Sequence, residues 1–105
     1  MGYYADHLQR YFQQRDVPRS AIYADKADFL RRFPAIIQYG VRNLEVRYPA
    51  ADTAVAVFDK TWDFRTQEDR RFAGDEQEQL TLRLMSGQWR ITSERENRVY
   101  WARYP

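Results

Sequence analysis

Lys26 has the most unusual surroundings of any charged side chain in the sequence. On a helix that turns about 100° per residue, it falls in the middle of an apolar stripe. The stripe consists of Ile22, Phe29, Leu30 and Phe33. An ammonium buried without a partner loses several kcal/mol of hydration or gives up its proton. We therefore predict a carboxylate partner on a facing sheet, for which the candidates are Asp59, Asp63 and Glu94.

Two interpretations of Lys26 follow from that position. The favoured one is structural: the aliphatic stem covers the core while the ammonium reaches an ion pair. The alternative is a lysine in a pocket, which binds an anionic ligand or takes part in catalysis.

His7 is the only histidine, and it follows Asp6 directly. Histidine titrates near neutrality without help, so an Asp-His pair is a candidate general base. Adjacent side chains of a strand point to opposite faces, however, which favours a structural or surface role. The weak candidates for catalysis are therefore His7, Lys26 and a sheet aspartate, Asp59.

Large aromatic side chains form a second candidate site. They can line an apolar cavity for a small hydrophobic ligand, or they can fill the core. A chain of this length needs most of its large side chains for stability, which favours a filled core. With Lys26, the candidate ligand-binding residues are Tyr11, Trp62, Phe64 and Trp89, and Phe58 belongs to the same aromatic set.

Mixed charges are concentrated between residues 65 and 78. The simplest interpretation is a solvated hairpin. Its members are Arg65, Glu68, Asp69, Arg70, Arg71, Asp75, Glu76 and Glu78.

One helix and several strands must position these residues. Residues 7–17 are predicted as a short strand, with a helix as the alternative. A helix is predicted over 18–33, with Asp16 or Ser20 as its cap and Pro34 at its end. Further strands are predicted over 37–48, 53–66, 77–85 and 88–104, with turns at 49–52, 73–75 and 86–87.

The strand over 53–66 carries apolar residues on both faces. Val55 and Val57 point to one side, and Ala54, Ala56, Phe58, Trp62 and Phe64 point to the other. A single helix can cover only one side, so we predict a homodimer that packs through the uncovered sheet face.

The composition excludes several classes of protein. The 105 residues fit a single domain, and 44% hydrophobic and 16% aromatic residues are enough to fold. A net charge of +2, from 17 basic and 15 acidic side chains scattered along the chain, argues against nucleic-acid binding. No cysteine and one histidine argue against a disulfide, a thiolate or a metal site, and we expect no cofactor.

The compartment follows by default. No apolar run is long enough for a membrane span and no signal peptide is visible, so we expect no membrane contact and a cytoplasmic location. Arginine dominates the basic residues, and Lys26 and Lys60 are the two lysines, which is typical of a GC-rich bacterial coding sequence. The opening Met1-Gly2, followed at once by aromatic and charged residues, is more typical of a cut inside a longer protein than of a natural start.

Five short stretches follow a recognisable pattern of aromatic and charged positions: Tyr-Ala-Asp-His-Leu-Gln-Arg-Tyr-Phe at 4–12, Val-Pro-Arg at 17–19, Ala-Asp-Lys at 24–26, Phe-Leu-Arg-Arg-Phe-Pro at 29–34 and Trp-Arg-Ile-Thr-Ser-Glu at 89–94. In these stretches the sequence resembles the NTF2-like (SnoaL-like) superfamily, which has a cone-shaped, cystatin-like α+β fold. The resemblance implies a curved antiparallel sheet of four to six strands packed on one main helix. Members normally begin with a long helix that closes the mouth of the cone. Here only a helix tail at residues 3–6 would represent it, so the pocket would be incomplete.

This superfamily includes isomerases, dehydratases, hydrolases and non-catalytic modules, so its name implies no single activity. The function we expect is a non-catalytic NTF2-like ligand-binding or dimerisation module of a bacterial protein. The alternative is a small NTF2-like enzyme that acts on a small hydrophobic molecule, with Lys26, His7 or a sheet aspartate as acid or base. An enzyme requires a water-excluding cavity where titratable groups converge, whereas a module predicts a filled cone.

Overall fold

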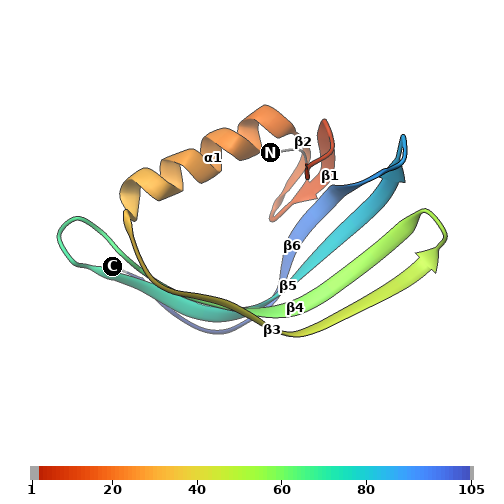
Figure 1. Cartoon of the computed structure of the whole chain (residues 1–105). Helices are drawn as coiled ribbons and strands as arrows, with labels where there is room; N and C mark the ends of the chain where they lie inside the picture. Colours follow the sequence, from red (N-terminus) through yellow and green to blue (C-terminus); the bar gives the residue numbers. More distant parts are fainter. Residues whose placement is uncertain (1–2, 105) are drawn as a thin grey trace.

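A curved sheet carries one helix across its concave side, and the computed structural model describes it over residues 3–104 (Figure 1). Within this range the sheet has six strands, in the order β2-β1-β6-β5-β4-β3. All neighbouring strands are antiparallel except β1 and β6. The elements are β1 (His7–Tyr11), β2 (Gln14–Pro18), α1 (Arg19–Arg32), β3 (Ala35–Ala50), β4 (Thr53–Arg65), β5 (Arg71–Met85) and β6 (Gln88–Arg103). The predicted α+β class, strand number and single main helix are confirmed.

Helix α1 lies where the sequence predicts it, but its cap differs. Pro18 is the N-cap residue, with φ −70°, and no side chain caps the helix. The predicted caps, Asp16 and Ser20, are wrong, because β2 still pairs Pro18 with His7 and runs directly into α1. At the other end, Phe33 is the C-cap and Pro34 follows it.

Three local predictions need correction. Residues 7–17 form a hairpin of two strands, turned at Phe12 with φ 54°. The turn predicted at 73–75 lies inside β5, and the chain reverses instead near Asp69, with φ 62°. The helix tail predicted at residues 3–6 is absent, because Tyr4 forms a parallel bridge with Ile91 of β6. The expectation of a cut at Met1-Gly2 lies outside the described residues.

The tight turn predicted at 86–87 is confirmed. Ser86 and Gly87 have φ values of 51° and 77°, the positive values that a two-residue hairpin turn between antiparallel strands requires. This turn joins β5 to β6 and thereby sets which of their side chains face the helix.

Strand alternation separates the two faces of the sheet. The concave face of β4 carries Lys60, Trp62 and Phe64, and the continuous β4–β5 register places Glu76 and Phe72 on the same side. The buried residues form two clusters under α1. One consists of Leu8, Tyr11, Val17 and Ile22, and the other of Phe33, Trp62 and Phe64.

The convex face is more polar than the sequence predicts. Val55 and Val57 point to this side as expected, but a cross-strand polar network covers much of the rest. Asp59, for example, accepts hydrogen bonds from Asn43 Nδ2 at 2.8 Å and from the Tyr100 hydroxyl at 2.7 Å. The apolar second face on which the predicted homodimer depends is therefore small, and dimerisation stays a prediction.

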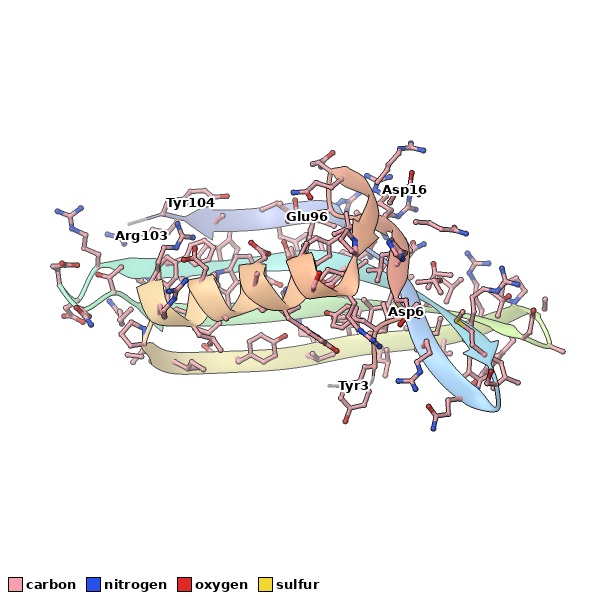
Figure 2. All side chains as sticks on the ribbon, turned by 90° about the horizontal axis from the view of Figure 1, so that it is seen from above. Tyr3, Asp6, Asp16, Glu96, Arg103 and Tyr104 are labelled. Atoms are coloured by element: carbon pink, nitrogen blue, oxygen red, sulfur yellow. The ribbon has the colours of Figure 1, made fainter. Side chains whose placement is uncertain are left out.

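Edge strand β3 carries many of the exposed apolar side chains. Figure 2 shows α1 running along the sheet between β6 and β3, so that the helix does not cover β3. The exposed apolar residues of this strand include Ile36, Tyr39, Val41, Leu44, Val46 and Tyr48. Over residues 3–104, no helix has the length and apolar character needed to cross a membrane.

Candidate functional site

A cavity of ≈ 580 Å³ lies between α1 and the concave face of the sheet. Its volume is in the usual range for small-molecule sites. Helix α1 contributes Asp25, Lys26, Asp28, Phe29, Leu30 and Arg32 to its wall, and the strands contribute Tyr11, Ile36, Tyr39, Lys60, Trp62, Phe64, Phe72, Glu76, Glu94, Val99, Ala102 and others. Tyr11, Trp62 and Phe64 belong to the buried clusters and also line this cavity, so they serve both the core and the cavity wall.

Aromatic rings form one wall of this cavity. Phe29 of α1 meets Phe64 edge to face, with ring centroids 5.2 Å apart, and lies 5.9 Å from Phe72. Trp62 lies 5.6 Å from Phe72. Edge-to-face packing of this kind fixes ring orientation, so the wall is a rigid apolar surface.

The position of the Trp62 indole requires that residue 74 has no side chain, as in Gly74. The two residues are paired across β4 and β5, and a Cβ on Gly74 would lie 2.4 Å from Trp62 Cζ2. Glycine thus lets the indole lie flat on β5. Trp62 is only 7% exposed, yet its Nε1 has no hydrogen-bond acceptor among the described residues.

Charged side chains form a second wall that adjoins the aromatic one, and Lys60 lies at their centre, with its Nζ 5.8 Å from the centroid of the Trp62 ring. Its Nζ is 3.1 Å from Glu76 Oε1 and 2.9 Å from Glu78 Oε2. All three side chains are mostly buried, with exposed fractions of 17%, 6% and 4%. The β4–β5 register produces this arrangement, because Lys60 is paired with Glu76 and Glu78 is the next residue on the same face.

Glu94 of β6 connects this cluster to the helix. Its Oε2 lies 3.8 Å from Lys26 Nζ, and its Oε1 accepts a hydrogen bond of 2.7 Å from the Tyr4 hydroxyl. The carboxyl group of Glu78 is close enough to that of Glu94 for a hydrogen bond between them to shift the pKa of both. The sequence therefore identified the correct partner for Lys26 in Glu94, whereas Asp59 and Asp63 lie on the convex side.

Burial controls the protonation of the glutamates. Burial, followed by the hydrogen bond to Glu96, raises the pKa of Glu76 to about 7. Burial, followed by the hydrogen bond to Glu94, raises the pKa of Glu78 to about 7. Both carboxyl groups therefore change charge near neutral pH.

Glu94 and Lys60 keep their charges. Burial acts to raise the pKa of Glu94, but the hydrogen bond from Glu78, the charge of Lys26 and the Tyr4 hydroxyl outweigh it and lower the pKa. Burial acts to lower the pKa of Lys60, but the neighbouring Glu78 and Glu76 outweigh it and raise the pKa. The cavity thus contains a charged lysine, a charged glutamate and two carboxyl groups that titrate near neutrality.

Tyr11 closes the cluster on the β1 side. Its hydroxyl donates a hydrogen bond of 2.8 Å to Asp25 Oδ2 of α1. Burial and this hydrogen bond raise the pKa of Tyr11, and burial and Glu94 raise that of Tyr4. Both hydroxyl groups are therefore fixed donors.

Four of the predicted ligand-binding residues meet at this cavity: Lys26, Tyr11, Trp62 and Phe64. The fifth, Trp89, does not line the cavity. It lies near the β5–β6 turn, 6.2 Å from Tyr48, and is 40% exposed. Phe58 is half-buried but does not line the cavity.

Two of the three catalytic candidates lie outside the cavity. His7 is exposed on β1, and its predicted partner Asp6 pairs instead with Arg19 at 3.0 Å. Asp59 is buried on the convex face, where it accepts hydrogen bonds from Asn43 and Tyr100. Of the three candidates, only Lys26 lines the cavity.

The sequence interpretation missed Lys60, Glu76 and Glu78 altogether. The sequence predicts Glu76 and Glu78 in a solvated hairpin, yet both residues are buried. A signal was present, because residues 72, 74, 76, 78 and 80 alternate on one face of β5 and this face begins with Phe72. No group of three or more side chains in residues 3–104 is arranged to hold a metal ion.

Comparisons with known proteins identify the fold. No family model matches the sequence, and no curated protein matches it. The crystal structure of the Kfla4162 protein from Kribbella flavida is similar, with a TM-score of 0.82 and 14% identity over 96% of this chain and 74% of that chain. The hexachlorocyclohexane dehydrochlorinase LinA-type3 from Novosphingobium barchaimii LL02 is also similar, with a TM-score of 0.76 and 13% identity over 96% of this chain and 70% of that chain.

This chain shares its α+β fold with both neighbours, in agreement with the NTF2-like (SnoaL-like) arrangement that the sequence predicts. At such low identity the similarity shows the fold alone. The function must be argued from the cavity.

Proposed function

We propose that this domain binds a small, mostly apolar molecule in the cavity under α1. The aromatic wall would hold the body of the ligand, and the glutamate–lysine cluster would hold its polar end. The single observation that carries the proposal is a cavity of ≈ 580 Å³ that brings these two walls together. Sites of this kind combine a mainly apolar lining with a few fixed polar groups.

The cost of the buried cluster supports the same proposal. Taking Lys60, Glu76 and Glu78 out of water costs several kcal/mol per ion, and an apolar replacement of similar size is often as stable. A ligand that uses these groups gives a reason to retain them. One structural neighbour is by its title a hexachlorocyclohexane dehydrochlorinase, so this fold can act on a small molecule.

Binding can be tested with phenylbutanol, a neutral probe with an apolar body and a polar end. In ¹H–¹⁵N NMR spectra we expect saturable shifts at the Trp62 indole and at residues around the cavity. Ala102 also lines the cavity, so Ala102→Phe fills it and should remove binding. Ala51→Phe, in the exposed turn between β3 and β4, is the matched control. The proposal is wrong if the probe gives no saturable shifts, or the same shifts in Ala102→Phe.

A second candidate is an acid–base enzyme, favoured by the burial of two neighbouring glutamates, Glu78 and Glu94. Glu94 lines the cavity, and Glu78 lies behind it and has a raised pKa. Such a pair can accept a proton from a carbon acid and return one. Deuterium exchange into beta-tetralone at the carbon next to its carbonyl tests this role, because exchange should fall in Glu94→Gln. Exchange no faster than buffer in the unaltered protein would remove this candidate.

The predicted homodimer is a separate proposal, now supported by the exposed apolar residues of edge strand β3 rather than by the convex face. A long apolar edge strand is prone to pairing with another chain. Sedimentation at micromolar concentration should detect a species of twice 12.7 kDa. A single 12.7 kDa species would contradict dimerisation.

A further inference from the structure

Carboxylates outnumber cations in the cavity wall. Five acidic side chains line the cavity, against three basic ones. The acidic ones are Asp25, Asp28, Glu76, Glu94 and Glu96, with Glu78 behind them, and the basic ones are Lys26, Arg32 and Lys60. The wall therefore has an excess of negative charge in a partly water-excluded space.

Each of the three cations already has a carboxylate partner. Lys60 pairs with Glu76 and Glu78, and Lys26 pairs with Glu94. Arg32 Nε lies 3.9 Å from Asp28 Oδ2. An anionic ligand would have to compete with these carboxylates for every cation. It would also add charge of the same sign as the excess.

Two carboxyl groups of the wall lack such a cation. Asp25 accepts the Tyr11 hydroxyl, and Glu96 accepts a hydrogen bond from Glu76. Within the described part of the chain, neither forms an ion pair. A positively charged ligand would therefore balance the excess negative charge of this cavity.

The aromatic wall is compatible with a positively charged ligand. Trp62 is 7% exposed and lines the cavity with its ring. Lys60 Nζ lies 5.8 Å from the centroid of the Trp62 ring, so this wall already accommodates an ammonium.

We infer that the ligand is a hydrophobic amine, protonated at neutral pH, with its apolar body against the aromatic wall and its ammonium among Glu76, Glu94 and Glu96. This inference rests on the proposed function and names the class of its ligand. The ammonium would take the place of the protons on the glutamates and balance their negative charge.

The inference implies that the affinity for an amine rises with pH. Glu76 and Glu78 lose their protons as the pH increases through about 7, so the cavity becomes more negative. The other titratable or charged groups that face them are Lys60 of β4, Glu94 and Glu96 of β6, Asp25, Lys26, Asp28 and Arg32 of α1, Tyr39 of β3, Tyr11 of β1, and Tyr4. Lys60 and Glu94 keep their charges over this range, because the pKa of Lys60 is raised and that of Glu94 is lowered.

Three probes with the same skeleton test the inference: phenylbutylamine, phenylbutanol and phenylbutanoate. We expect calorimetry to give an affinity for the amine at least about tenfold above that for the alcohol, with the carboxylate weakest. The affinity for the amine should rise from about pH 6 to about pH 8, whereas that for the alcohol should not change. The amine itself stays protonated over this range, so the rise would report the protein.

Charge variants separate the glutamates from general effects. Glu96 is exposed at the cavity wall, so Glu96→Gln should fold normally and weaken the amine but not the alcohol. Glu76→Gln should act in the same direction, and Glu45→Gln, which removes an exposed charge of β3 outside the cavity, should change neither.

The outcomes distinguish this inference from the proposed function. Equal affinities for amine and alcohol, or tightest binding of the carboxylate, would overturn the amine and leave the small-molecule site standing. Absence of binding by all three probes would overturn both.

Discussion

Lys26 Nζ on α1 lies 3.8 Å from Glu94 Oε2 on β6, and this ion pair ties the helix to the sheet beside the cavity. The two ends of the pair differ in exposure, because the Lys26 side chain is 44% exposed and that of Glu94 is 6% exposed. Removing Lys26 would therefore leave a buried, unpaired charge on Glu94, whereas removing Glu94 would leave a lysine that water can solvate.

Lys26→Met should lower the free energy of unfolding by about 1 kcal/mol, a modest loss because solvent screens the exposed lysine. Urea denaturation measures this change. In a Glu94→Gln background, the same substitution should cost less, because no buried charge is left behind. Unchanged or higher stability of Lys26→Met, with no loss of affinity for the probes, would remove Lys26 from the site.

Lys60→Met should be far more damaging, because it leaves Glu76 and Glu78 without their shared cation. Breaking a buried pair in this way costs about 3–5 kcal/mol. At about pH 5 both glutamates can be protonated, so the loss should be smaller there than at about pH 8. Equal losses at the two pH values would show that Lys60 acts through packing alone.

The pH dependence of stability should reveal the buried glutamates. The pKa values of Glu76 and Glu78 rise from 4.5 to about 7 on folding, so the folded chain binds more protons between these values. Their contribution is fully present below about pH 4.5 and is lost as the pH rises through about 7. Chemical denaturation from about pH 5 to about pH 8 should show falling stability. The slope should flatten in Glu76→Gln/Glu78→Gln and persist in Glu45→Gln.

Gly74→Ala tests the packing of Trp62. The new methyl group would lie 2.4 Å from Trp62 Cζ2, so the indole must move, and overpacking of this kind costs about 1–3 kcal/mol. Gly40→Ala is the matched control, since nothing lies within 4 Å of its added Cβ. Thermal unfolding and tryptophan fluorescence should change in the first variant only. Similar behaviour of both variants would contradict the close approach of Trp62 to Gly74.

Much of the fold could be predicted because its signals are local. Pro18 and Pro34 bracket α1, and Ser86-Gly87 provides the hairpin turn. The error at 73–75 has a physical cause, because Gly74 serves the packing of Trp62 rather than a turn. The presence of a glycine in the sequence does not show whether it forms a turn or makes room for a neighbouring side chain.

The candidate site was predictable only in part. Lys26 stands out because its own helix is apolar around it, and Glu94 was among its predicted partners. The pairing of Lys60 with Glu76 depends on the register between β4 and β5, and Glu76 lies in a polar stretch of the sequence. The alternation along β5 is a weak signal of burial, because Glu76 and Glu78 are themselves charged, so the sequence indicated a solvated hairpin.

The central claim is that the space under α1 is a ligand site with an aromatic wall and an acidic wall. The Trp62 indole N–H lies in that wall and has its own NMR signal, so a titration with phenylbutylamine tests the claim most directly. We predict a saturable shift of this signal that disappears in Ala102→Phe and weakens in Glu96→Gln. A Trp62 signal that stays unmoved at millimolar amine, or that shifts equally in Ala102→Phe, would contradict the account.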